Sequence, residues 1–281
     1  MSDNNILVIE DGVLKGYKGQ GGTIVIPEEV KTIFSVPFCD HFEPFDLTLS
    51  NNLTCSFTSV LSQGIRTLTI PAGTNFECSN CNPNKTSFFT LLESITVDPN
   101  NPYCASENGM LLNKEKTILY ACPSAHPGNK GVLVVPDTVT TIENGAFGTC
   151  KKLKEIVLPP SVKHIGDRAF VDCKALKKLV LPDGIESIGK EAFLRCGKLT
   201  SAGLKGSDKK GYTFEFPWIT EIPANAFSGM NKLQKVVLPE TIKVIGKGAF
   251  KGCKSLEEIN LPENVKCDKK AFKDCTKLTI G

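Results

Sequence analysis

Residues Leu153–Cys173 read LKEIVLPPSVKHIGDRAFVDC. The alternation Ile-Val-Leu is the period-2 pattern of a β-strand, and the proline after it ends the strand because proline cannot donate to a sheet. The V-x-x-I-G block is expected to turn the chain, and A-F-x-x-C is expected to form a short helical turn behind the strand. Because one such unit cannot bury its apolar side alone, copies of it should stack.

The same blocks recur through the second half of the chain with a period of 23 residues, as the spacing of Pro136, Pro159 and Pro182 shows. The Ala-Phe pair is followed three positions after its phenylalanine by Cys150, Cys173, Cys196, Met230, Cys253 or Cys275. A repeat of this length predicts an α/β repeat solenoid, with a parallel sheet on one face and short helical turns on the other.

Weaker copies of the strand and its closing proline occur in the first half, at 24–27, 68–71 and 92–99. Two stretches, 34–64 and 72–91, fit no copy and are expected to be irregular insertions, whereas two apolar runs around a polar turn at 109–120 predict a hairpin. We therefore divide the chain into degenerate N-terminal repeats with insertions, residues 1–130, and regular repeats of 22–23 residues, residues 131–281, continuous with the first part.

One spacing in the regular part is longer than the others. Phe193 and Phe227 are 34 positions apart, and residues 200–213 between them are rich in Gly, Ser and Lys. Because a solenoid accommodates insertions as loops, we expect this segment to project from the stack.

The repeat unit resembles that of the BspA-like (Treponema pallidum-type) leucine-rich repeat proteins, which share the L-x-x-I-x-L-P, V-x-x-I-G and A-F-x-x-C blocks. The resemblance is strong over 131–281 and partial over 20–130. It implies a right-handed leucine-rich-repeat superhelix and a surface or secreted protein of adhesion and interaction type. From the sequence we expect no export signal and no flanking anchor or immunoglobulin-like domain, an expectation that leaves the compartment open, with the cytoplasm included.

Composition agrees with a folded protein and excludes several classes. The 281 residues are 41% hydrophobic and 22% charged, which argues against disorder, collagen and simple coiled coils. No apolar run reaches the roughly 20 residues of a membrane span, so we expect no transmembrane segment.

Twelve cysteines raise the question of metal or redox chemistry. Those in phase with the repeat, and Cys267, are expected to be buried thiols, because methionine replaces one of them at position 230. Cys78-x-x-Cys81 is a weak candidate for a metal site, to which Cys39, His41 and Cys55 could add ligands; a local disulfide and free thiols are the alternatives. We expect no cofactor.

Catalytic motifs are missing from the sequence. There is no P-loop, G-x-S-x-G, H-E-x-x-H or dinucleotide fingerprint, and the histidines His41, His126 and His164 stand in no recognisable constellation. The chain is therefore predicted not to be an enzyme, and no catalytic residue is assigned.

The outward face of the sheet is the predicted binding surface for a protein or glycan partner, because solenoids bind through extended sheet faces. Four valines fall at one outward position of successive strands; the alternative is that they only serve β-propensity. The candidate contact residues are Val134, Val157, Val180, Val237, Glu215, Lys154, Lys178 and Lys235.

Charge is distributed unevenly along the chain. Residues 1–150 carry a net charge of −7 and residues 151–281 a net charge of +10, the latter with 23 lysines and two arginines. A polyanion-binding module using the Lys-rich C-terminal half is thus the alternative function. Nucleic acid is an unlikely partner, because arginine forks and interleaved aromatic residues are sparse.

Overall fold

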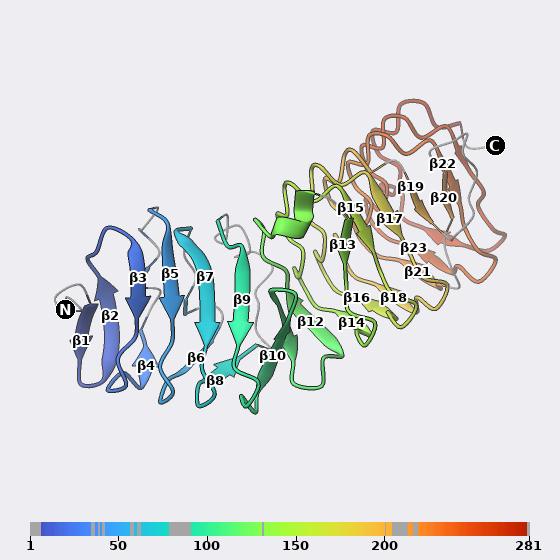
Figure 1. Cartoon of the computed structure of the whole chain (residues 1–281). Helices are drawn as coiled ribbons and strands as arrows, with labels where there is room; N and C mark the ends of the chain where they lie inside the picture. The colour runs from blue at the N-terminus through green and yellow to red at the C-terminus, as the bar shows by residue number, and fades with distance from the viewer. Residues whose placement is uncertain are drawn as a thin grey trace. The chain divides into compact units, whose positions relative to one another are not determined.

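A computed structural model describes residues 7–34, 37–38, 40, 43–56, 59–60, 63–78, 91–130, 132–199, 201–203, 213–215 and 219–279. The chain forms two compact units, residues 1–126 and 127–281. Each unit is a stack of coils whose strands lie side by side along the stack (Figure 1). No helix in these described stretches is long and apolar enough to span a membrane.

The main sheet of unit 2 takes one strand from each regular turn of the solenoid and two from the turn that carries the insertion, and it is parallel throughout. The middle residues Leu133, Ile156, Leu179 and Val236 of four of these strands are buried, as the period-2 pattern predicts. In sheet order, the strands are β13 (Val132–Val134), β15 (Glu155–Val157), β17 (Lys178–Val180), β19 (Ser201–Gly203), β20 (Thr213–Glu215), β22 (Lys235–Val237) and β24 (Glu258–Ile259).

A second set of parallel strands comes from the V-x-x-I-G block, which was expected only to turn the chain. Ile142, Ile165 and Ile188 are aligned in neighbouring strands and point into the core. Each regular coil therefore has two strand sides. The strands are β14 (Thr141–Ile142), β16 (His164–Ile165) and β18 (Ser187–Ile188), and, in a separate sheet, β21 (Glu221–Ile222), β23 (Val244–Ile245) and β25 (Lys266–Cys267).

The predicted helical turns behind the sheet are wrong. No α-helix occurs in the described part of the chain, which has only the 3₁₀ helix η2 (Pro127–Lys130), and the A-F-x-x-C blocks are arcs of consecutive turns. Five of the six arcs have left-handed residues at two places, as at Arg168 (φ 55°) and Asp172 (φ 59°), and the last arc has one, Asp274 (φ 65°); these residues interrupt a right-handed helix. The fold is thus a β-solenoid of the leucine-rich-repeat type, without the expected α/β character.

The arcs are held to one another by backbone hydrogen bonds that run from coil to coil. Phe147 N–H donates to Ala169 O at 2.8 Å, and Phe170 N–H donates to Ala192 O at 2.8 Å. These bonds satisfy backbone groups that a helix would have paired within itself, so the third side of each coil also depends on its neighbours.

The core of unit 2 is a column of stacked phenylalanines. Phe147, Phe170 and Phe193 are fully buried, with ring centroids 4.9 and 5.2 Å apart and planes within 8° of parallel. This spacing is close to the 4.7–4.9 Å between hydrogen-bonded strands, so one ring per coil fills the interior without a gap.

A second column consists of the cysteines in phase with the repeat. Cys150, Cys173, Cys196 and Cys253 are completely buried. Their thiols are bonded across coils; for example, Cys173 Sγ–H donates to Phe147 O at 3.1 Å. The prediction of buried thiols is confirmed for these four, whereas Cys275 is only partly buried and Cys267 is exposed, against expectation, because it lies in the last coil.

The ends of the predicted insertion at 200–213 belong to the sheet and do not project from it. β19 and β20 are neighbouring parallel strands, with Ala202 aligned to Phe214, and β20 continues the pairing to β22. Residues 204–212 lie outside the described part of the chain. The sheet therefore gains one strand at this point, although the arc side gains no extra turn: Phe193 N–H donates directly to Ala226 O at 2.8 Å.

Unit 1 has the same kind of coil, with two sheets that are parallel except for the pair β1 and β2, and its first half has more strands than the sequence suggested. Phe45 and Leu47 of a strand within 34–64 are buried, so the described residues of this stretch include a strand of the coil pattern, where an irregular insertion was expected. One sheet contains β3 (Gly22–Val25), β5 (Phe45–Thr48), β7 (Ile65–Ile70) and β9 (Ser94–Val97), and the other β1 (Leu7–Glu10), β2 (Val13–Tyr17), β4 (Thr32–Ile33), β6 (Thr54–Ser56) and β8 (Asn75–Glu77).

Two antiparallel pieces depart from the coil pattern in unit 1. β1 pairs with β2 at the start of the unit. Where a hairpin was expected, at 109–120, β11 (Met110–Asn113) pairs antiparallel with β12 (Ile118–Ala121), and β10 (Cys104–Glu107) pairs with the other side of β11.

Candidate functional site

The outward side of the main sheet in unit 2 brings several of the predicted contact residues together. Val134, Val157 and Val180 are aligned in register on the adjacent strands β13, β15 and β17. Val134 is 58% exposed and Val157 is 40% exposed, whereas Val180 is half-buried. We call these three residues and Val132, which is also exposed, the valine stripe of unit 2. Three members of the stripe, Val132, Val134 and Val157, are among the exposed large apolar residues of the described chain.

The fourth valine lies apart from this stripe. Val237 is in β22, and the two strands of the insertion separate it from Val180. Glu215 lies in β20, aligned with Val237, but its side chain is outside the described part of the structure. The valine stripe therefore extends over three neighbouring strands and not over the whole sheet.

The predicted lysines flank the valines, and two of them form salt bridges with glutamates of neighbouring strands. Lys178 Nζ lies 3.0 Å from Glu155 Oε1, and Lys235 Nζ lies 2.8 Å from Glu258 Oε2. The hydrogen bond that Lys235 donates to the Glu258 carboxylate raises the pKa of Lys235. Lys154 is exposed beside β15. The two cross-strand pairs make this edge of the sheet polar with little net charge.

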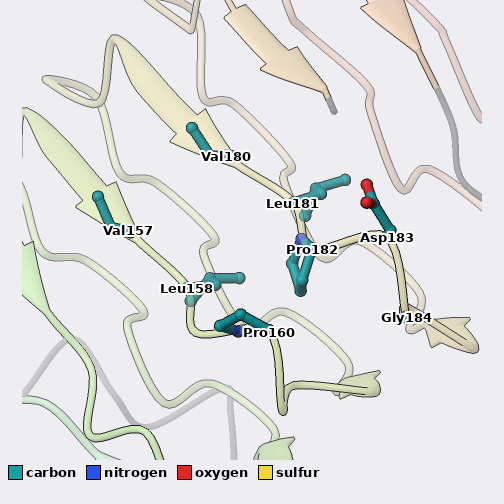
Figure 2. Close-up of a pocket in the computed structure, with 8 residues that line it drawn as sticks. All are labelled: Val157, Leu158, Pro160, Val180, Leu181, Pro182, Asp183 and Gly184. Atoms are coloured by element: carbon teal, nitrogen blue, oxygen red, sulfur yellow. The ribbon is translucent and has the colours of Figure 1, made fainter. Parts of the chain in front are cut away.

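A pocket of about 390 Å³ adjoins the valine stripe where β15 and β17 end. Figure 2 shows Val157 and Val180 on neighbouring strands and the chain of each coil turning at the prolines below them. Six of the lining residues are apolar and one, Asp183, is charged. The residues are Val157, Leu158, Pro160, Val180, Leu181, Pro182, Asp183 and Gly184.

Sequence analysis missed this pocket, although a signal for it exists. The residue after the corner proline is acidic in four of the regular copies, and proline replaces it once, at Pro160. This substitution removes a carboxylate beside Asp183 and leaves an apolar wall. We call the acidic residues at this position the acidic file. All of them are exposed, and they are Asp137, Asp183, Glu240 and Glu263.

The weak metal candidate gains no support from the described residues. Cys78 is buried and its thiol lies 3.6 Å from Phe76 O, while Cys81, Cys39 and His41 lie outside the described part of the chain. Within that part, no group of three or more His, Cys, Asp or Glu side chains could hold a metal ion. His164 Nδ1 lies 2.9 Å from Ser187 Oγ in the second sheet, away from the pocket residues.

Comparison with known proteins gives a consistent picture. The model of the BspA type leucine rich repeat region matches residues 131–216 and 210–280, with six copies. No curated protein matches the chain.

Solved structures of leucine-rich repeat proteins share the fold. A leucine-rich repeat protein from Eubacterium ventriosum is 22% identical, with a TM-score of 0.67, over 94% of this chain and 78% of that one. A leucine rich cell surface protein from Faecalibacterium prausnitzii is 23% identical, with a TM-score of 0.58, over 92% of this chain and 58% of that one. The pneumococcal vaccine antigen PcpA is 20% identical, with a TM-score of 0.51, over 92% of this chain and 57% of that one. At these identities the likeness concerns the fold.

Proposed function

Because the chain belongs to the BspA-type leucine-rich repeat family, we propose that it is a non-catalytic binding protein whose valine stripe contacts a protein partner. The observation that supports this proposal is the alignment of exposed Val134 and Val157 with Val180 beside an apolar pocket. Contiguous exposed apolar surface is uncommon in soluble proteins unless it binds something.

A protein fits this surface better than a glycan does. The stripe and the pocket offer branched aliphatic side chains and proline rings, with few hydrogen-bonding groups among the lining residues. A sugar surface would leave hydroxyl groups unpaired against such a wall, and each buried unpaired polar group costs free energy. Apolar side chains of a protein would be buried there at no such cost.

The polyanion alternative receives little support from this face. Lys178 and Lys235 form salt bridges with Glu155 and Glu258, at the start of their strands. The acidic file lies beyond the other end of the strands, after the corner prolines. A phosphate or sulfate group would therefore meet carboxylates close to the lysines, which reduces its electrostatic attraction.

Location at a cell surface belongs to the same proposal. One structural neighbour is described as a cell surface protein and another as a vaccine antigen. If this chain acts in the same compartment, its partner is a protein that is accessible outside the cell.

Site-specific photo-crosslinking tests the function. A photoreactive phenylalanine analogue at Val134, on the sheet, is compared with the same analogue at Lys190, which is exposed on the other side of the coil. Extracellular-matrix and cytoplasmic extracts are used in parallel, and crosslinked proteins are identified by mass spectrometry. We expect a protein that crosslinks from Val134 and not from Lys190.

The identified protein is then purified and its binding measured against a V157K/V180K double variant. Both valines lie on the outward side of their strands, so the fold should persist while binding is lost. Crosslinking only to glycan material, equal crosslinking from both positions, or unchanged affinity of the folded double variant would reject the proposal.

A further inference from the structure

We infer that the pocket at the ends of β15 and β17 holds an aromatic side chain of a partner protein whose adjacent residue is basic. This inference rests on the proposed function and adds the chemistry of the segment that is recognised.

The pocket has the size and the walls for an aromatic ring. Its volume of about 390 Å³ is at the lower end of small-ligand sites, roughly 300–1,000 Å³. Leu158 and Leu181, which are nearly inaccessible, form its floor, and Val157, Val180 and Pro160 stand around them. An aromatic side chain buries roughly 150–250 Å² with only two side-chain torsions to fix, so it gains more from such walls than a flexible chain does.

The negative charge beside the pocket favours a basic residue of the partner next to its aromatic residue. Asp183 is the one ionisable residue among the lining residues, and its carboxylate lies beside Leu181 (Figure 2). Lysines of the same face are paired elsewhere, Lys178 with Glu155 and Lys235 with Glu258. A cationic residue of the partner would therefore meet an acidic edge at Asp183, and an acidic residue would be repelled.

The acidic file extends this preference beyond the pocket. Asp137, Glu240 and Glu263 occupy the position of Asp183 in other coils and are exposed. Among the corners of unit 2 that the structure describes, the one at Pro160 is the one without a carboxylate, and the apolar pocket lies there; the corner Pro217-Trp218 lies outside the described residues. This row of corner positions thus has one apolar recess among acidic residues. A partner segment with one aromatic residue among basic residues would be complementary to it.

Methyl NMR with defined peptides tests the inference. The full chain is labelled with ¹³C at the valine and leucine methyl groups and titrated with acetyl-Gly-Phe-Lys-Gly-amide. Two matched probes replace Phe by Ala or Lys by Glu. The ring of a bound phenylalanine shifts the methyl resonances of Val157, Val180 and Leu181, so the site of binding is read directly.

Variants separate the two parts of the recognition. D183N should weaken binding of the Phe-Lys peptide about threefold, and the loss should shrink at high salt. V180T places a hydroxyl group on the wall at nearly constant volume and should weaken binding by a similar factor. E240Q removes an equivalent carboxylate away from the pocket and is the matched control, which should bind as the parent does.

The expected result is saturable shifts of the pocket methyls with a dissociation constant of about 1 mM for the Phe-Lys peptide and weaker binding of both other probes. Absence of shifts, equal binding of the Phe-Glu peptide, or equal effects of D183N and E240Q would overturn the inference. If a protein crosslinks from Val134 but no peptide enters the pocket, this inference fails and the proposed function stands. If the Phe-Lys peptide binds but nothing crosslinks, the proposed function fails.

Discussion

Phe193 and Phe227 stack with ring centroids 5.3 Å apart and planes 14° apart, although 34 positions separate them in the chain. The neighbouring pair Phe170 and Phe193 stacks at 5.2 Å across 23 positions. The insertion therefore leaves the aromatic column unbroken, and the described residues at its ends belong to the main sheet, in the neighbouring strands β19 and β20.

This relationship predicts that the insertion can be removed. Deleting residues 202–213 joins Ser201 to Phe214 and restores the pattern Leu-x-x-Phe, with Phe193 and Phe227 then 22 positions apart, as Phe250 and Phe272 are. We expect a folded protein whose Tm changes by less than about 5 °C, measured by circular dichroism. Deleting residues 179–190 removes the same length from a regular coil and should unfold unit 2; equal losses for both deletions would contradict the prediction.

Phe170 is expected to be among the most important side chains for stability. It is fully buried and stacked on both faces, against Phe147 and Phe193. F170A should lower the free energy of unfolding by about 3–5 kcal/mol, measured by urea denaturation. Phe272 stacks on one neighbour only, Phe250, and is not fully buried, so F272A should cost clearly less. A larger loss for F272A would show that the column does not limit stability.

Gly189 is predicted to tolerate no side chain. A Cβ atom there would lie 2.4 Å from Asp167 N and 2.4 Å from Gly166 C, backbone atoms of the preceding coil that cannot move aside separately. G189A should therefore destabilise the protein by more than about 2 kcal/mol. At Gly184 the nearest atom to a Cβ would be Pro160 O at 3.7 Å, so G184A should change stability by less than about 0.5 kcal/mol. Thermal unfolding of both variants measures the difference, and similar Tm values would refute the close approach.

The cysteines should react with very different rates. Cys267 is exposed, whereas Cys150, Cys173 and Cys196 are completely buried, and burial raises the pKa of Cys173 well above its ordinary value. In a pulse of iodoacetamide on the native protein, mapped peptide by peptide, Cys267 should be labelled in the folded state and the buried three only on unfolding. C267S should leave the labelling of the buried three unchanged; rapid labelling of Cys173 in the folded protein would disprove its burial.

Stability should fall at alkaline pH because of the buried thiols. Burial is the main cause that raises the pKa of Cys55 from 9.0 to about 12. Above pH 9 the unfolded chain releases this proton and the folded chain retains it, so the free energy of unfolding decreases by about 1.4 kcal/mol per pH unit for this group until pH reaches the folded value. Below pH 9 the thiol is neutral in both states and has no effect.

Urea denaturation at pH 8, 9 and 10 measures this loss. C55A removes the contribution of Cys55, so its stability should decline less steeply with pH than that of the parent protein. Identical slopes for the two proteins would contradict the raised pKa.

Much of the fold could be predicted from the sequence because every coil places the same residue types at the same positions. The period-2 pattern around Ile156 identified strands with buried centres, and the replacement of the in-phase cysteine by Met230 identified Cys173 and its equivalents as core residues. Interpretation of the arcs failed because apolar residues at i, i+3 and i+6 suit a helix and a run of turns equally. Gly145, Gly248 and Asn225 before the alanine of the Ala-Phe pair were the overlooked signal for left-handed backbone.

The candidate site could be predicted only in part. The sequence placed Val134, Val157 and Val180 on one outward stripe, since outward positions follow from the strand period. It did not show that Lys178 is paired with Glu155, because that contact joins residues 23 positions apart in neighbouring coils. Nor did it show the pocket, whose walls come from two coils.

The sequence by itself thus determined that this protein is a stack of repeated coils and which side chains fill its interior, since both follow from periodicity along the chain. Only the tertiary structure decided that each coil has strands on two sides and turns on the third, that the insertion enters one sheet, and that Pro160 and Asp183 border a recess. These features depend on hydrogen bonds and contacts between coils, which a pattern within a single coil does not contain.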